Sequence, residues 1–173
     1  MLEILHTAFG FVSLATGLLV FTNRKGTRWH RQMGAAYMIS MLGLNLTAFG
    51  IYRLFDGFGI FHWAALASLA TIIPAFLVVR FRHRFKNWLS MHYQFMCWSF
   101  LGLLGATSNE TFVHVPYANQ LAQQFTWLPN LSLFLIFTLG GIVLFRREAA
   151  ALKPFKRASQ PGSPGIATPS PGV

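Results

Sequence analysis

Residues 2–31 read LEILHTAFGFVSLATGLLVFTNRKGTRWHR, an apolar run followed at once by a basic cluster. The run Leu2–Thr22 has about 20 residues, the helix length that crosses a hydrocarbon layer of about 30 Å. The cluster contains Arg24, Lys25, Arg28 and Arg31. Lysine and arginine beside a membrane-spanning helix are retained on the cytoplasmic side. This stretch therefore predicts a transmembrane helix whose C-terminal end faces the cytoplasm.

Four more apolar runs follow, and the basic residues alternate between the connections that join them. The runs are His30–Phe55, Phe61–Phe81, Trp88–Thr107 and Pro129–Phe145. The third connection and the C-terminal tail are basic, with Arg80, Arg82, Arg84, Lys86, Arg146, Arg147, Lys153, Lys156 and Arg157. The second and fourth connections hold only Arg53. The pattern predicts five spans, with the N-terminus outside and the C-terminus inside.

The composition favours a membrane protein built from helices alone. Of the 173 residues, 54% are hydrophobic and only 10% are charged, which is unlike the balance in soluble domains. Backbone exposed to lipid must satisfy its own hydrogen bonds, so the apolar runs are predicted to be α-helices. Short connections make neighbouring helices antiparallel. We predict an all-α, polytopic, multi-pass protein of the bacterial inner membrane, an up-down bundle of four transmembrane helices plus a fifth.

This architecture divides the chain into four segments. Residues 1–107 are the four-helix transmembrane core, and 108–128 are an outer loop with room for a short interfacial helix. Residues 129–146 are the fifth transmembrane helix, and 147–173 are a cytoplasmic tail that is basic and then disordered. Within the core, the polar side chains expected to form hydrogen bonds between helices are Asn45, Ser68, Thr71 and Gln94.

Several function classes are excluded by the sequence. The net charge of +10 would suit nucleic acid, but the basic residues lie at helix ends, where they retain topology and meet lipid headgroups. The single cysteine, Cys97, provides neither a disulfide nor a thiolate zinc motif. The sequence has no phosphate-binding loop, dinucleotide glycine pattern or nucleophile elbow. No catalytic residue is assigned, and whether the protein is an enzyme stays open.

Four of the six histidines form two pairs at matched depth in the predicted bundle. His6 and His62 lie near the outer face, and His30 and His92 lie near the inner face. Each pair comes from two helices that run in the same direction. Facing helices of a bundle are a common source of axial histidines for haem iron. The four residues are therefore candidate ligands for two b-type haems, one in each leaflet.

The outer side also holds a different candidate metal site. Glu3 and His6 are three residues apart, which places them on one helix face. Glu110 and His114 follow in the outer loop, and His62 is close to them in the topology. Mixed carboxylate and imidazole ligands suit zinc, manganese or non-haem iron. An outer site of Glu3, His6, His62, Glu110 and His114 is thus the alternative to haem.

The segment KGTRWHRQMGAAY, residues 25–37, resembles the signature of an uncharacterised bacterial membrane family, domain of unknown function 2306. His6, with Ala8 and Gly10 after it, and His92, with Met96 four residues later, are also similar to that family. The resemblance covers about residues 1–110 and implies no established reaction. The chain departs from the family pattern after His92, where Tyr93, Gln94 and Phe95 replace a more basic sequence. A weaker, architectural likeness is to di-haem b-type membrane cytochromes.

These patterns lead to one main functional prediction and two alternatives. The main prediction is a membrane-embedded haem or metal redox protein that exchanges electrons with a quinone or another electron carrier in the lipid bilayer. The alternatives are the outer non-haem metal site and a non-enzymatic protein, either a small transporter or an accessory subunit that contacts other membrane subunits. Nucleic acid is not an expected partner.

Overall fold

The computed structural model describes residues 1–51 and 59–158, and every regular element in these residues is helical. The helices are α1 (Leu2–Thr22), α2 (Arg28–Ala48), α3 (Ile60–Arg80), α4 (Trp88–His114), α5 (Pro116–Gln124) and α6 (Leu128–Ala158), with a short 3₁₀ turn, η1 (Arg82–Arg84), before α4. The prediction of an all-α protein of the membrane type is confirmed. Arg53, Asp56 and the tail segment 159–173, which was expected to be disordered, lie outside the described residues.

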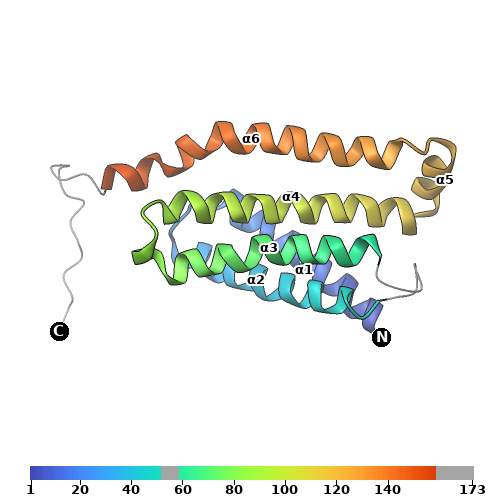
Figure 1. Cartoon of the computed structure of the whole chain (residues 1–173), viewed down its shortest axis with the longest axis horizontal. Helices are drawn as coiled ribbons and strands as arrows, with labels where there is room; N and C mark the ends of the chain where they lie inside the picture. Colours follow the sequence, from blue (N-terminus) through green and yellow to red (C-terminus); the bar gives the residue numbers. More distant parts are fainter. Residues whose placement is uncertain (52–58, 159–173) are drawn as a thin grey trace.

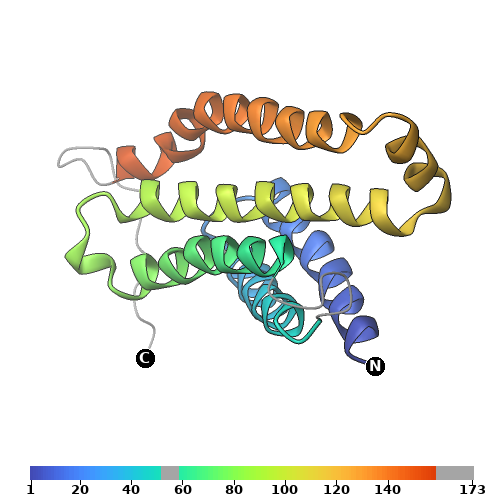
Figure 2. The ribbon, with the colours of Figure 1, turned by 45° about the vertical axis from the view of Figure 1, so that its right-hand side comes forward.

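The first four helices form a bundle in which each helix has two neighbours. α1 packs against α2 and α4, and α3 packs against the same two helices, so α2 and α4 lie diagonally opposite each other. α6 lies along the outside of α4, and α5 crosses the end of the structure that also holds the N-terminus (Figures 1 and 2).

Among the residues that the structure describes, three helices are long and apolar enough to cross a membrane, within Leu2–Thr22, Phe61–Arg80 and Leu128–Lys153. α6 is the most peripheral of them, since only 6% of its apolar window is buried, against 28% for α3. α2 and α4 are not among the three, although both are at least as long as α1. That they also span the membrane stays a prediction, supported by their antiparallel packing alongside α1 and α3.

Polar residues explain why α2 is less apolar than its neighbours. Its side chains form hydrogen bonds with three other helices: Tyr37 with Ser99 (2.9 Å), Ser40 with Ser13 (2.9 Å), Asn45 with Ser68 (3.0 Å) and Thr47 with His6 (3.0 Å). We refer to these four contacts as the α2 hydrogen bonds. Asn45 and Ser68 were each predicted to form interhelical hydrogen bonds and do so with each other, whereas Thr71 donates to a carbonyl oxygen of its own helix. Hydrogen bonds of this kind hold membrane helices together where burial of apolar surface contributes little.

The apolar core of the bundle lies beside these hydrogen bonds. Tyr37, Ile72 and Ala75 have no exposed surface, and Met41 and Met96 are almost fully buried. The outer surface is also apolar, as expected for a protein in lipid, with large exposed side chains such as Phe11, Phe76 and Phe134. Gly17 allows α1 to approach this core closely, because a Cβ there would lie 2.6 Å from the ring of Phe100.

The helix ends differ from the predicted boundaries in three places. α2 ends at Ala48, whereas the predicted run continued to Phe55. α4 continues to His114, beyond the expected end of the core at residue 107, and α5 occupies part of the predicted outer loop. α6 continues to Ala158, so the first residues of the predicted tail are helical. Polar residues such as Asn109 and Arg147 do not end these helices, because outside the hydrocarbon layer polar side chains can be solvated.

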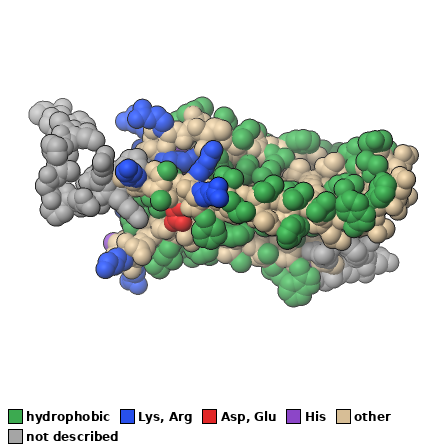
Figure 3. All heavy atoms as spheres, turned by 90° about the horizontal axis from the view of Figure 1, so that it is seen from above, with side chains coloured by type: hydrophobic (Ala, Val, Ile, Leu, Met, Phe, Trp, Pro, Cys, Tyr) green, Lys and Arg blue, Asp and Glu red, His purple; other side chains and the backbone are tan. Residues whose placement is uncertain are grey.

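The basic side chains gather at one end of the molecule, and the rest of the visible surface is largely apolar (Figure 3). The connection 23–27, the turn η1 and the C-terminal part of α6 lie at this end (Figure 1). We refer to it as the basic end. This placement agrees with the alternation of basic connections in the sequence.

Candidate functional site

The inner histidines lie at the basic end, where the turn between α1 and α2 positions the first of them. Gly26 has a φ of 80°, a left-handed conformation that residues with a side chain rarely adopt. Thr27 then caps α2, since its hydroxyl oxygen accepts a hydrogen bond from the His30 backbone N–H at 3.1 Å. The sequence Lys25-Gly26-Thr27 thus fixes where α2 begins and places His30 in its first turn.

Lys25 closes the preceding helix. Its Nζ donates to the carbonyl oxygens of Val20 at 2.7 Å and Phe21 at 2.9 Å, which are among the unpaired carbonyls at the end of α1. Burial of the amine lowers the pKa of Lys25 below its usual value. A cation at a helix C-terminus is also favoured by the helix dipole. Lys25 therefore brings a partly desolvated positive charge close to His30.

His92 is held by a hydrogen bond to the neighbouring helix. Its Nδ1 lies 3.0 Å from the carbonyl oxygen of Ala75 in α3. Because a carbonyl oxygen only accepts, Nδ1 must carry the hydrogen, and the lone pair is then on Nε2 in the neutral ring. Histidines that bind metals commonly donate their second ring N–H to a carbonyl in this way.

His30 has a buried nitrogen with no partner. Its Nδ1 is inaccessible and forms no hydrogen bond within the described part of the chain. Its ring interacts with the Val20 carbonyl and lies within electrostatic range of His92 and Lys25. A buried polar atom without a partner costs about 1–3 kcal/mol, so this nitrogen marks a position where a ligand would be stabilising.

The two inner histidines come from the diagonal helices α2 and α4. Neighbouring helix axes lie about 8–10 Å apart, so the diagonal of a square bundle is about 13 Å. Two imidazoles that reach inward across such a diagonal leave a narrow gap between them. A metal ion between two imidazole nitrogens needs a gap of about 4 Å, twice the usual metal–nitrogen distance. The helix arrangement is therefore compatible with one metal ion between His30 and His92, whereas a haem iron in this position would need additional room for its porphyrin.

The outer histidines are occupied by other contacts. His6 pairs with the Thr47 hydroxyl at 3.0 Å. His62, which is 2% exposed, accepts a hydrogen bond at Nδ1 from the Gly59 backbone N–H at 3.1 Å. The neutral His62 ring then carries its hydrogen on Nε2, and neither nitrogen has a lone pair free for a metal. These contacts do not favour ligation by the outer pair.

The carboxylates of the alternative outer site are not gathered around these histidines. Glu110 pairs with His114 one turn later at 3.0 Å, and both side chains are well exposed. Glu110 also lies within electrostatic range of His6. Across residues 1–51 and 59–158, however, no three histidine, cysteine, aspartate or glutamate side chains are grouped so that they would hold a metal ion. The outer set of Glu3, His6, His62, Glu110 and His114 is thus not assembled as a site.

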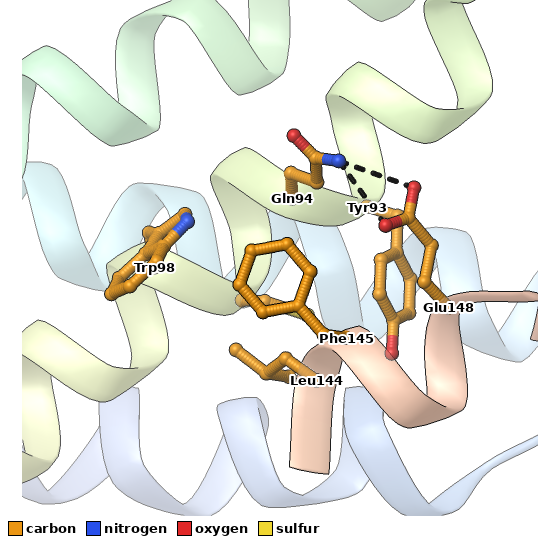
Figure 4. A pocket seen from close by; sticks show the side chains of 7 residues that line it. Tyr93, Gln94, Trp98, Leu144, Phe145 and Glu148 are labelled. Carbon is orange, nitrogen blue, oxygen red and sulfur yellow. Dashed lines mark hydrogen bonds between the residues drawn. The ribbon is translucent and has the colours of Figure 1, made fainter. Parts of the chain in front are cut away.

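One polar cluster was not expected from the sequence. Glu148 of α6 accepts hydrogen bonds from Ser90 and from Gln94 of α4, the latter at 3.1 and 3.3 Å (Figure 4). The interhelical role predicted for Gln94 is confirmed, but its partner was missed. Glu148 lies beside Arg146 and Arg147 in the sequence, and the only available signal was a single acidic residue within a basic segment.

Comparison with known proteins bears on the first 138 residues. A family model described as "Predicted membrane protein (DUF2306)" matches residues 3–138, which include all five helices from α1 to α5 apart from Leu2. The match extends beyond the residues that carried the resemblance in the sequence. No curated protein and no solved structure matches the chain.

Proposed function

The chain belongs to the DUF2306 family of predicted membrane proteins, and we propose that it binds haem b through His30 and His92 and transfers electrons within the membrane. The observation that carries the proposal is the buried Nδ1 of His30, which lacks a hydrogen-bond partner and lies on the helix diagonally opposite His92. His92 is oriented by Ala75 with a lone pair left on Nε2. Two neutral imidazoles from facing helices are a common axial pair for haem iron.

The core of the bundle offers apolar and aromatic side chains of the kind that line a porphyrin. Tyr37 and Met96 belong to the buried core cluster, and Phe95 packs against it. These side chains would exclude water from a porphyrin, which favours a stable electron carrier over a catalyst that needs an open coordination position. Because Tyr37 and Met96 now fill the core, we expect α2 and α4 to move apart when a porphyrin is inserted.

Haem supplies a one-electron carrier, and its potential depends on the charges around it. Lys25 lies within electrostatic range of His30, so its positive charge would favour the reduced form. The partner that best suits a carrier embedded in lipid is a quinone or another membrane electron carrier. In this proposal the protein passes electrons at the inner side of the bacterial cytoplasmic membrane.

The proposal is tested by the visible spectrum of the full chain, purified from membranes in mild detergent after expression with a haem precursor. We expect a Soret band that shifts when dithionite is added, with about one haem per chain by pyridine haemochrome analysis. His30→Ala and His92→Ala should each abolish the band.

His83→Ala is the matched control, because His83 is an exposed histidine in η1 at the same end of the molecule. This variant should retain the full spectrum. A colourless wild-type protein under these conditions would overturn the proposal, as would a His92→Ala spectrum equal to that of the wild type. A colourless preparation containing stoichiometric zinc or manganese would instead support the outer metal site, and one without any metal would support a transporter or an accessory subunit.

A further inference from the structure

The hollow between α4 and α6 at the basic end has a composition unusual for a membrane surface. It is lined by aromatic side chains, including Tyr93, Trp98 and Phe145, together with the carboxylate of Glu148 (Figure 4). Trp98 is 40% exposed and Phe145 is 68% exposed, so the hollow opens to the surroundings of the protein. Aromatic ring faces and a carboxylate together attract organic cations.

Glu148 is positioned to receive such a cation. Its carboxylate accepts hydrogen bonds from Ser90 and Gln94, which fix its orientation. No lysine or arginine forms an ion pair with it among the side chains that the structure describes. The carboxylate is therefore able to accept a positive partner from outside the protein.

The size of the hollow decides between possible ligands. A volume of about 10 Å³ is open to a group the size of water, which is room for one water or one primary ammonium group. It is too small for the ring of a quinone or for a trimethylammonium group. Arg147 lies between the lining residues Phe145 and Glu148 on α6 and is within electrostatic range of Tyr93. A negative group next to the ammonium would therefore meet a guanidinium.

We propose that this hollow binds the headgroup of a phosphatidylethanolamine lipid. The ammonium group would contact Glu148 and the aromatic rings, and the phosphate would lie beside Arg147. The hollow lies at the basic end, the height at which the lipid headgroups of the cytoplasmic leaflet are found if the predicted orientation holds. Charge complementarity selects a zwitterionic lipid over an anionic one, because the carboxylate repels a headgroup that lacks a cation. The proposal does not depend on haem.

The test uses the full chain, reconstituted into vesicles that contain equal amounts of phosphatidylethanolamine, phosphatidylcholine and phosphatidylglycerol. The protein is then extracted in mild detergent, and the retained lipid is measured by mass spectrometry. The wild type should retain phosphatidylethanolamine in preference to the other two lipids. Glu148→Gln should reduce this retention about tenfold, the effect of losing one hydrogen bond to a charged group.

Glu110→Gln is the matched control, since it removes the same charge from an exposed carboxylate outside the hollow. It should retain lipid as the wild type does. Phe145→Leu leaves the Glu148 hydrogen bonds intact and should lower retention severalfold, so the proposal stays testable if Glu148→Gln does not fold. Equal retention of phosphatidylglycerol or phosphatidylcholine by the wild type would overturn it, as would full retention by a folded Glu148→Gln or Phe145→Leu variant.

Discussion

The side-chain nitrogen of Lys25 lies 2.7 Å from the carbonyl oxygen of Val20, so a lysine of the connection closes the helix that precedes it. The same nitrogen reaches Phe21, also at the end of α1. Gly26 and Thr27 come directly afterwards and start α2. Three consecutive residues thus end one helix and begin the next, which gives a physical reason for the segment Lys25-Gly26-Thr27 of this chain.

Because of Lys25, the free energy of unfolding should vary with pH in the alkaline range. Burial lowers the pKa of its amine in the folded state, so the unfolded state binds more protons between the folded pKa and the usual value of about 10.4. Stability therefore rises with pH through this window. In Lys25→Met this contribution is absent. The melting temperature of the wild type relative to Lys25→Met should increase as pH rises from 8 towards about 10.5, measured in detergent. A difference that falls over this range would contradict the expectation.

Tyr37→Phe should destabilise the bundle by about 0.6–1.5 kcal/mol, the range for one interhelical hydrogen bond. The substitution removes the contact with Ser99, which is 2% exposed in α4. Tyr117→Phe is the control, because Tyr117 is 71% exposed on α5 and its replacement should be neutral. Thermal unfolding of both variants in the same detergent provides the comparison. Equal melting temperatures for the two variants would show that the Tyr37 hydroxyl contributes nothing.

Gly17→Ala should destabilise the packing of α1 by about 1–3 kcal/mol, the usual cost of overpacking a core. The added Cβ would lie 2.6 Å from Phe100 and 3.0 Å from Tyr37, both of them rigid rings. Gly102→Ala is the control, since a Cβ there meets nothing within 4 Å and alanine is the better helix former. We expect a lower melting temperature for the first variant and an unchanged or higher one for the second. The reverse order would contradict the close approach at Gly17.

The predicted orientation can be tested with single cysteines in a Cys97→Ser background. Gln123→Cys on α5 and His83→Cys in η1 both place a thiol at an exposed position, at opposite ends of the molecule. If the basic connections face the cytoplasm, a membrane-impermeant thiol reagent should label residue 123 but not residue 83 in spheroplasts. Labelling of residue 83 should appear only after the membrane is permeabilised. Labelling of residue 83 alone in intact spheroplasts would mean that the orientation is inverted.

The sequence predicted the helical class and most helix positions, because apolar runs of membrane length admit little else. It also placed His30 and His92 at the same depth, since helix length fixes the height of each residue. It failed where an outcome depends on the neighbouring helix. That His6 pairs with Thr47, or that Gln94 donates to Glu148, follows from side-chain directions at each contact. The depth of a residue along its helix does not determine which partner its side chain will find on the next helix.

The α2 hydrogen bonds have a consequence for how the protein is made. α2 is more polar than the three helices that are apolar enough to cross a membrane, and the hydrogen-bond partners of its side chains lie on α1, α3 and α4. When α2 leaves the ribosome, only α1 has been synthesised. Asn45 therefore has no partner on another helix until α3 arrives, and Tyr37 has none until α4 arrives. We expect the insertion machinery to keep α2 away from lipid during this delay. A nascent chain truncated before α4 should therefore remain bound to the translocon or be degraded.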